Sequence, residues 1–135
     1  MEILIHLDTK KIDTDYQKAV DEYIKRTSPF CKVSIKTYKS FEKLTLNKSS
    51  EKFILTTGPK TRTSPELAQM IQNINLKGIS RIEFLVTDNF QLEKLSHVSE
   101  FHISSFSMSI ELTTVVLTEQ IYRAYTILNN ITYHK

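Results

Sequence analysis

Residues 2–7 read Glu-Ile-Leu-Ile-His-Leu, and this nearly continuous apolar run is typical of a β-strand that is buried on both faces. Two further runs repeat the pattern, Phe53-Ile54-Leu55 and the segment 82–86. By contrast, residues 32–38 alternate between apolar and polar side chains, which predicts a strand near an edge of the sheet with one solvated face. A fifth strand is expected at 102–106. Strands that are buried on both faces favour a mostly parallel sheet that is covered on each side.

Helices are expected between these strands, because apolar residues recur there at the helical spacing of three and four. A capping-box pattern indicates one helix start at Thr14, and Thr63-Ser64-Pro65-Glu66 indicates another. A short helix is expected at 92–98 and a long one at 109–129. The alternation of strands with helices predicts a single α/β domain that spans residues 1–135.

The carboxyl ends of the expected strands are the places to look for a ligand, because parallel sheets bind ligands beyond those ends. The segments that lie there are 56–61, 87–91 and 104–108. These three segments are therefore the first candidates for a binding site.

Composition excludes several classes of protein. The chain has only 2 glycines, and Gly58 and Gly78 lie too far apart for a dinucleotide fingerprint or a Walker loop. A single cysteine, Cys31, and no histidine pair at metal-ligand spacing predict no disulfide and no metal site. No signal peptide and no apolar run of membrane-spanning length is present, so a reduced, cytoplasmic setting is expected. Residues 1–60 hold 12 Lys and Arg against 8 Asp and Glu, which suits a polyanionic partner or simply a solvated surface.

The last third of the chain carries many polar groups on one expected helix, Leu117-Thr118-Glu119-Gln120-Ile121-Tyr122-Arg123-Ala124-Tyr125, and the sequence closes with Tyr133-His134-Lys135. From spacing alone, a solvated helix face and a frayed tail would explain this pattern. Both stretches nevertheless resemble the C-terminus of the RlmH family of ribosomal large-subunit rRNA methyltransferases, within the SPOUT superfamily. Further residues that carry the resemblance are Asp21-Glu22-Tyr23-Ile24-Lys25-Arg26 before Pro29-Phe30, and Lys60 with Ser64 through Ala68.

The resemblance implies a SPOUT-like α/β fold, with a mostly parallel five-stranded sheet, helices on both faces and a C-terminal trefoil knot. It also implies a homodimer that transfers a methyl group from S-adenosylmethionine to N3 of a pseudouridine, with the ribosome or its large-subunit rRNA as partner. Arg123 would hold an RNA phosphate or orient the tail, while Tyr133 and His134 would close the pocket and manage the N–H proton of the base. The residues implied in cofactor binding are Leu55, Ile103, Ser104, Ser105, Phe106, Ser107 and Met108.

The sequence departs from the family pattern where the cofactor would approach. Relatives carry Gly-Gly directly after the fourth strand, whereas this chain has Thr87-Asp88, whose Cβ atoms would crowd the approach, more so if φ is positive there. The family's Pro and His in the next segment are Ser109 and Ile110, and its Arg one turn later is Thr114. Two interpretations stay open: a methyltransferase that binds its cofactor largely through backbone groups, or a catalytically inactive dimer that binds RNA, the ribosome or another protein.

The helix expected at 109–129 also predicts the homodimer from its own composition. Its apolar residues are spread too widely around the helix for a single buried stripe. These residues are Val115, Val116, Leu117, Ile121, Tyr122 and Tyr125.

Overall fold

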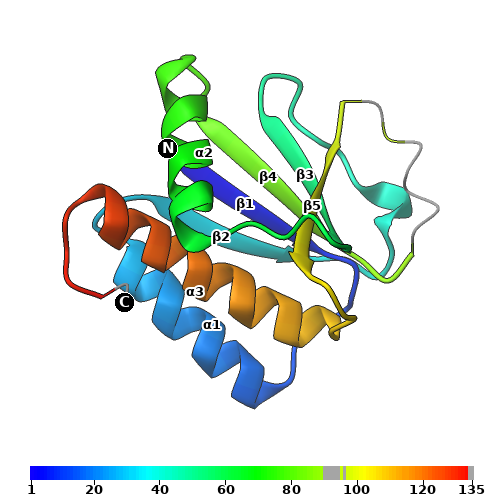
Figure 1. Ribbon diagram of the computed structural model, residues 1–135. Helices are drawn as coiled ribbons and strands as arrows, with labels where there is room; N and C mark the ends of the chain where they lie inside the picture. The colour runs from blue at the N-terminus through cyan, green and yellow to red at the C-terminus, as the bar shows by residue number, and fades with distance from the viewer. Residues whose placement is uncertain (90–94, 96, 134–135) are drawn as a thin grey trace.

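The computed structural model describes residues 1–89, 95 and 97–133 of the 135-residue chain. Within these residues, strands and helices alternate along the sequence except that β5 follows β4 directly (Figure 1). The strands are β1 (Glu2–Leu7), β2 (Lys32–Thr37), β3 (Glu51–Thr57), β4 (Arg81–Val86) and β5 (Ser99–Ser104). The helices are α1 (Thr14–Thr27), α2 (Ser64–Leu76) and α3 (Ile110–Leu128), together with the 3-10 helix η1 (Phe41–Lys43).

The sheet has five strands in the order β2-β1-β4-β3-β5, and every neighbouring pair is parallel. The predicted parallel sheet is therefore confirmed, and so is the edge position of the strand that begins at Lys32. The fifth strand begins at Ser99 instead of 102, because Ser99 and Glu100 pair with Phe53 and Ile54 of β3. Ser99 and Glu100 are polar residues on an edge strand, so the apolar pattern used to predict strands did not include them.

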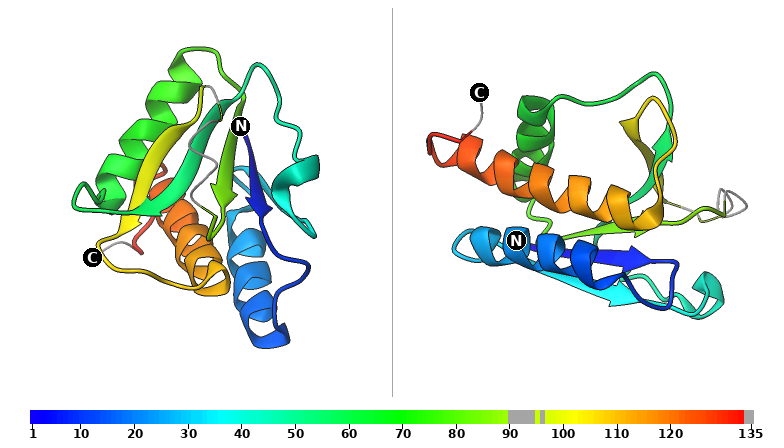
Figure 2. Two further views of the ribbon diagram at one scale, coloured as in Figure 1. Left: turned by 90° about the vertical axis from the view of Figure 1, so that its right-hand side faces the viewer. Right: turned by 90° about the horizontal axis from the view of Figure 1, so that it is seen from below.

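The direction of each connection decides which face of the sheet it covers. The steps from β1 through α1 to β2 and from β3 through α2 to β4 run the same way across the sheet, so right-handed crossovers place both helices on one face. Helix α3 packs against α1 and α2 on that face (Figure 2). The β2–β3 connection steps the opposite way and covers the second face. Among the described residues, the helices expected on both faces are thus unevenly divided, with η1 alone on the second face.

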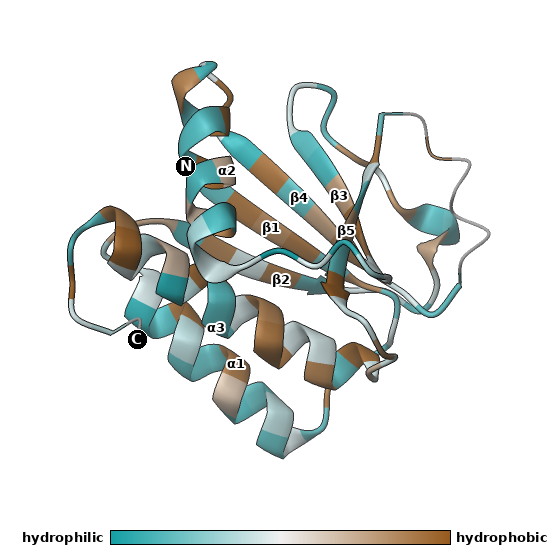
Figure 3. Ribbon diagram, viewed as in Figure 1, coloured by the Kyte–Doolittle hydropathy of each residue, from teal (hydrophilic) through white to brown (hydrophobic). Residues whose placement is uncertain are grey.

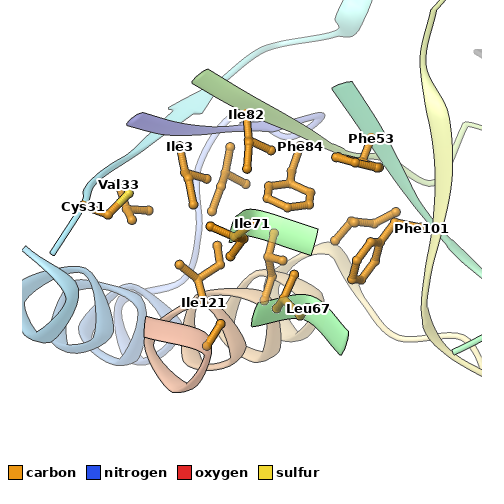
Figure 4. Close-up of a cluster of buried hydrophobic side chains, with 14 of the residues drawn as sticks. Ile3, Cys31, Val33, Phe53, Leu67, Ile71, Ile82, Phe84, Phe101 and Ile121 are labelled. Carbon is orange, nitrogen blue, oxygen red and sulfur yellow. The ribbon is translucent and has the colours of Figure 1, made fainter. Parts of the chain in front are cut away.

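The main core lies between the sheet and the three α-helices. Ile3, Ile5 and Leu7 of β1 point to this side and are fully buried. Figure 4 shows side chains of β1, β3 and β4 directed toward Ile71 of α2 and Ile121 of α3. Figure 3 shows the matching bands of apolar and polar residues along α1 and α3. Burying each such side chain contributes roughly 1.5–3 kcal/mol, and this core fixes where the strand ends lie.

The second face has a smaller core, built from Phe41, Ile54 and Leu85. Tyr38, Leu44 and Leu46 from the β2–β3 connection pack against it. The short helix expected at 92–98 falls mostly on residues outside the described part of the chain. The trefoil knot stays a prediction.

Candidate functional site

The carboxyl ends of β3, β4 and β5 meet beside the start of α3 (Figure 1). Residues at these ends line a cavity of about 100 Å³. Its lining residues are Leu55–Thr57 of β3, Val86–Asp88 at the end of β4, Ile103, Ser107 and Met108 around the end of β5, and Ile110 and Thr113 of α3. All three segments that the sequence placed at strand ends contribute. This is the position at which parallel sheets bind ligands.

Four of the seven predicted cofactor residues line this cavity, namely Leu55, Ile103, Ser107 and Met108. Ser104 instead organises the loop, because its hydroxyl accepts a hydrogen bond from the Phe106 N–H at 3.1 Å and its carbonyl accepts one from the Gly58 N–H at 3.0 Å. Ser105 and Phe106 are exposed and do not line the cavity.

The turn after β4 is held by side-chain hydrogen bonds. The Thr87 hydroxyl donates to a carboxylate oxygen of Asp8 at 2.6 Å and accepts from the Asn89 N–H at 3.0 Å. Neither Thr87 nor Asp88 is among the described residues with positive φ. The backbone strain that positive φ would cause at a Thr-Asp pair is therefore absent, and the Thr87 hydroxyl is bound to Asp8, which directly follows β1.

Thr56 is a candidate that the sequence did not single out. It lines the cavity, it is buried, and its hydroxyl has no hydrogen-bond partner in the described structure. A buried hydroxyl without a partner costs free energy, and such groups call for a ligand or water to satisfy them. The sequence feature that could have identified Thr56 is its position directly after Leu55, at the end of a strand.

A histidine holds the loop that follows β3. The His102 ring lies against Gly58, where an added Cβ would come within 2.4 Å of the ring. The Lys60 N–H donates to Nδ1 of His102 at 3.2 Å, so the neutral ring carries its proton on Nε2, 3.6 Å from Glu100. His102 also borders a second cavity of about 620 Å³ between α2, β5 and α3, lined in addition by Arg62. This larger cavity contains none of the predicted site residues except Ile103.

The tail folds back onto α3 because of the turn that ends the helix. Asn130 adopts φ 56°, and the Ile131 N–H donates to the carbonyl of Thr126 at 2.9 Å. This is a Schellman-type ending, in which asparagine tolerates the left-handed conformation. The reversal brings Tyr133 back to Tyr122, with the ring centroids 4.8 Å apart.

Arg123 and Tyr133 meet at one carboxylate. The Arg123 Nε donates to Glu119 at 2.9 Å, the Tyr133 hydroxyl donates to the same oxygen at 3.3 Å, and the guanidinium lies 5.2 Å from the Tyr133 ring centroid. The hydrogen bond to Glu119 raises the pKa of Arg123, while burial and the Glu119 charge raise the pKa of Tyr133. Both groups therefore keep their protons. His134 lies outside the described residues.

No group of three or more His, Cys, Asp or Glu side chains among the described residues could hold a metal ion. No helix in the described part has the length and apolar content to cross a membrane.

Comparisons with known proteins identify the family. A family model described as "Predicted SPOUT methyltransferase" matches residues 1–134. The chain belongs to this SPOUT methyltransferase family. Curated relatives carry the more specific name: the chain is 35% identical to "Ribosomal RNA large subunit methyltransferase H 1" of Thermoanaerobacter sp. (strain X514), over the full length of both. It is 32% identical to "Ribosomal RNA large subunit methyltransferase H" of Mycoplasmopsis synoviae (strain 53), covering 93% of this chain and 94% of that protein. The resemblance to RlmH is confirmed.

Within this SPOUT chain, the tail and the strand-end cavity are separate. Thr113 lines the cavity and Arg123 contacts the tail, and the ten residue steps of helix from one to the other rise about 15 Å. Within the described residues, one chain therefore does not bring Arg123 and the cavity together.

Proposed function

We propose that the chain is a cytoplasmic S-adenosylmethionine-dependent methyltransferase of large-subunit rRNA, which modifies N3 of a pseudouridine. The observation that carries this proposal is the cavity where β3, β4 and β5 end, because it gathers Leu55, Ile103, Ser107 and Met108. RlmH relatives over the whole length of the chain support the same reaction.

The residues of the cavity suit this cofactor chemically. The unpartnered Thr56 hydroxyl offers a hydrogen-bonding group, and the Asp88 carboxylate matches a positively charged sulfonium. The cofactor supplies the methyl group when bound. Typical small-molecule pockets enclose roughly 300–1,000 Å³, so this cavity of about 100 Å³ must widen to admit a nucleoside.

We propose a homodimer with the trefoil knot of this family as the active form. The separation between the cavity and the tail within one chain supports it, since a second copy can bring its own tail to the cavity. Helix α3 offers surface for this contact: Val115, Val116 and Tyr122 are only partly buried, and Leu112 is 40% exposed. Leu117, Ile121 and Tyr125, by contrast, are buried in the chain's own core.

The proposed roles of the tail follow from its contacts. Arg123 pairs with Glu119 and stacks on Tyr133, which favours its role in orienting the tail over direct capture of a phosphate. Tyr133 covers the base, and His134 takes the N–H proton of the base.

The test is methyl transfer to large ribosomal subunits that lack this modification, read by mass spectrometry of the nucleosides. We expect N3-methylpseudouridine with the unaltered chain and its loss in Ser107→Trp, whose indole fills the cavity. Ser80→Trp is the control, because Ser80 is also exposed but lies before β4, at the opposite end of that strand from the cavity. If ribosomal subunits bind but stay unmodified by the unaltered chain, the protein is an inactive binding module instead.

A further inference from the structure

Among the described residues, one charged side chain lines the strand-end cavity. Asp88 is the one ionisable side chain among the described residues that line it, and it lies exposed at the end of the inner strand β4. The other described lining residues are apolar or carry neutral hydroxyls, among them the unpartnered Thr56. A ligand in this cavity therefore meets a negative charge.

A second carboxylate lies near the same turn. Leu7 pairs with Val86 across β1 and β4, so Asp8 and Thr87 follow at the same level of the sheet. Asp8 is held there by the hydrogen bond from the Thr87 hydroxyl at 2.6 Å, but it does not line the cavity. Asp88 is thus the carboxylate that a ligand in the cavity meets, in a chain whose net charge is +3.

Methyl transfer changes the charge of the ligand. S-Adenosylmethionine carries a positive sulfonium, and loss of the methyl group leaves S-adenosylhomocysteine with a neutral thioether. A carboxylate beside the ligand attracts the sulfonium and has no charge to attract in the thioether. A fixed negative charge at the cavity therefore favours the substrate over the product.

We propose that Asp88 is a specificity-determining residue, whose charge makes the cavity bind the cationic methyl donor more tightly than its neutral product. The inference rests on the proposed function, because it presupposes that the cavity takes S-adenosylmethionine. Its consequence is that the spent cofactor leaves more readily than it would from an uncharged cavity. The neutral isostere, Asp88→Asn, keeps the size of the side chain and removes this preference.

Calorimetry of the purified chain with S-adenosylmethionine and with S-adenosylhomocysteine tests the proposal without any catalytic assay. For the unaltered chain we expect binding of the first to be about threefold to tenfold tighter than binding of the second. Asp88→Asn should weaken only S-adenosylmethionine and bring the ratio close to one, whereas Asp88→Glu should retain it. Asp15→Asn, on the exposed first turn of α1, is the matched control and should leave the ratio unchanged. High ionic strength should narrow the ratio in the unaltered chain.

The outcomes separate the two proposals. If the unaltered chain binds neither compound, the proposed function fails and this inference fails with it. If it binds both equally, or if Asp88→Asn leaves their ratio unchanged, the role of Asp88 is overturned while the cofactor site stands. Melting temperatures of the variants, measured without ligand, show whether any loss of affinity comes from unfolding.

Discussion

The Nε2 atom of His6 lies 3.0 Å from a carboxylate oxygen of Glu83, and both side chains are almost completely buried. The other carboxylate oxygen accepts from the Ser50 hydroxyl at 2.5 Å and from the Asn47 N–H at 3.1 Å. Because an ionised carboxylate only accepts, His6 donates through Nε2, and its Nδ1 accepts from the Tyr38 hydroxyl at 2.6 Å. This network ties the central strands β1 and β4 to the β2–β3 connection on the second face.

Removing the carboxylate should therefore destabilise the fold. Glu83→Ala leaves the buried donor of His6 and the partly buried donors of Asn47 and Ser50 without an acceptor, and we expect a loss of about 3–5 kcal/mol in unfolding free energy. Urea unfolding followed by circular dichroism measures it. Glu42→Ala, at an exposed position of η1 on the same face, is the control and should leave stability unchanged. Equal small effects of both substitutions would contradict a structural role for the network.

Stability should also depend on pH through the same pair. Burial lowers the pKa of His6 below its ordinary value of 6.5, although the hydrogen bond to Glu83 opposes this. The unfolded chain then binds a proton at His6 more readily than the folded chain does, so the unfolding free energy should fall as pH drops from about 7.5 to about 5.5.

Glu83 extends the same trend to lower pH. Burial raises the pKa of Glu83, but hydrogen bonds from Ser50, His6 and Asn47 outweigh it and hold the pKa below 4.5. Its stabilising contribution is present above 4.5 and is lost on further acidification. His6→Gln, which cannot titrate, should flatten the slope between about pH 7.5 and about pH 5.5 in urea unfolding experiments. An unchanged slope in this variant would assign the pH dependence to other groups.

Local patterns predicted helix boundaries only where the partners are local. The capping box at Thr63 and Glu66 forms in both directions, because its two partners are three residues apart. The similar pattern at Thr14 correctly predicted where α1 begins, but no capping box forms there, because the N-cap is Asp13 and no side-chain cap hydrogen bond is present. The N–H of Asp13 instead donates to Glu111 of α3 at 3.0 Å, and this partner lies 98 residues away. No local sequence signal could show that contact.

The candidate site divides in the same way. The segments 56–61, 87–91 and 104–108 could be placed together because a parallel sheet brings its strand ends to one edge, whereas Leu55 and Ile103 were assigned to the site from the family resemblance. The Asp8–Thr87 hydrogen bond joins residues that are 79 positions apart, so its effect on the turn after β4 could not be predicted from the local sequence. The return of Tyr133 to α3 depends on the left-handed conformation of Asn130, which composition alone does not predict.

Gly58 should tolerate no side chain while His102 is in place. In Gly58→Ala the added Cβ would lie within 2.4 Å of the His102 ring, so the ring must move and its hydrogen bond from Lys60 is lost. We expect a loss of about 1–3 kcal/mol in unfolding free energy, as for other overpacked sites. The double variant Gly58→Ala with His102→Ala should recover most of this loss relative to His102→Ala alone. Simple additivity of the two substitutions would show that the ring is not the obstacle.

The proposed homodimer predicts a difference between two exposed leucines. Leu112 on α3 is 40% exposed, and Leu76 at the end of α2 is 76% exposed. Light scattering at micromolar concentration should give a dimer for the unaltered chain, a monomer for Leu112→Asp and a dimer for Leu76→Asp. A buried unpaired charge at an apolar interface is the physical reason. A monomer for the unaltered chain would remove the shared site altogether.

The tail should affect methyl transfer more than it affects folding. Glu119 holds both Arg123 and Tyr133, so Glu119→Gln weakens the ion pair and frees the tail while nearly preserving the size of the side chain. An i,i+4 pair on a helix contributes only about 0.3–0.5 kcal/mol to stability. We therefore expect a small change in melting temperature and a much larger fall in the rate of methyl transfer to rRNA. Tyr133→Phe keeps the ring contact with Tyr122, so its rate of methyl transfer should lie between the rates of the unaltered chain and of Glu119→Gln.

His134→Ala separates positioning by this network from chemistry at the tail. If His134 takes the proton of the base, its loss should slow methyl transfer by roughly 10²–10⁴-fold, the usual contribution of a positioned general base. The loss should appear in kcat, measured at saturating RNA. Glu119→Gln should also raise KM, because a freed tail must be ordered again when RNA binds.

Arg123→Ala should have the same effects as Glu119→Gln, since Arg123 contacts Glu119 and Tyr133. If Arg123 instead held a phosphate, its removal would lower the salt dependence of RNA binding by about one unit of slope. Transfer at the unaltered rate by His134→Ala would exclude the tail from the chemistry.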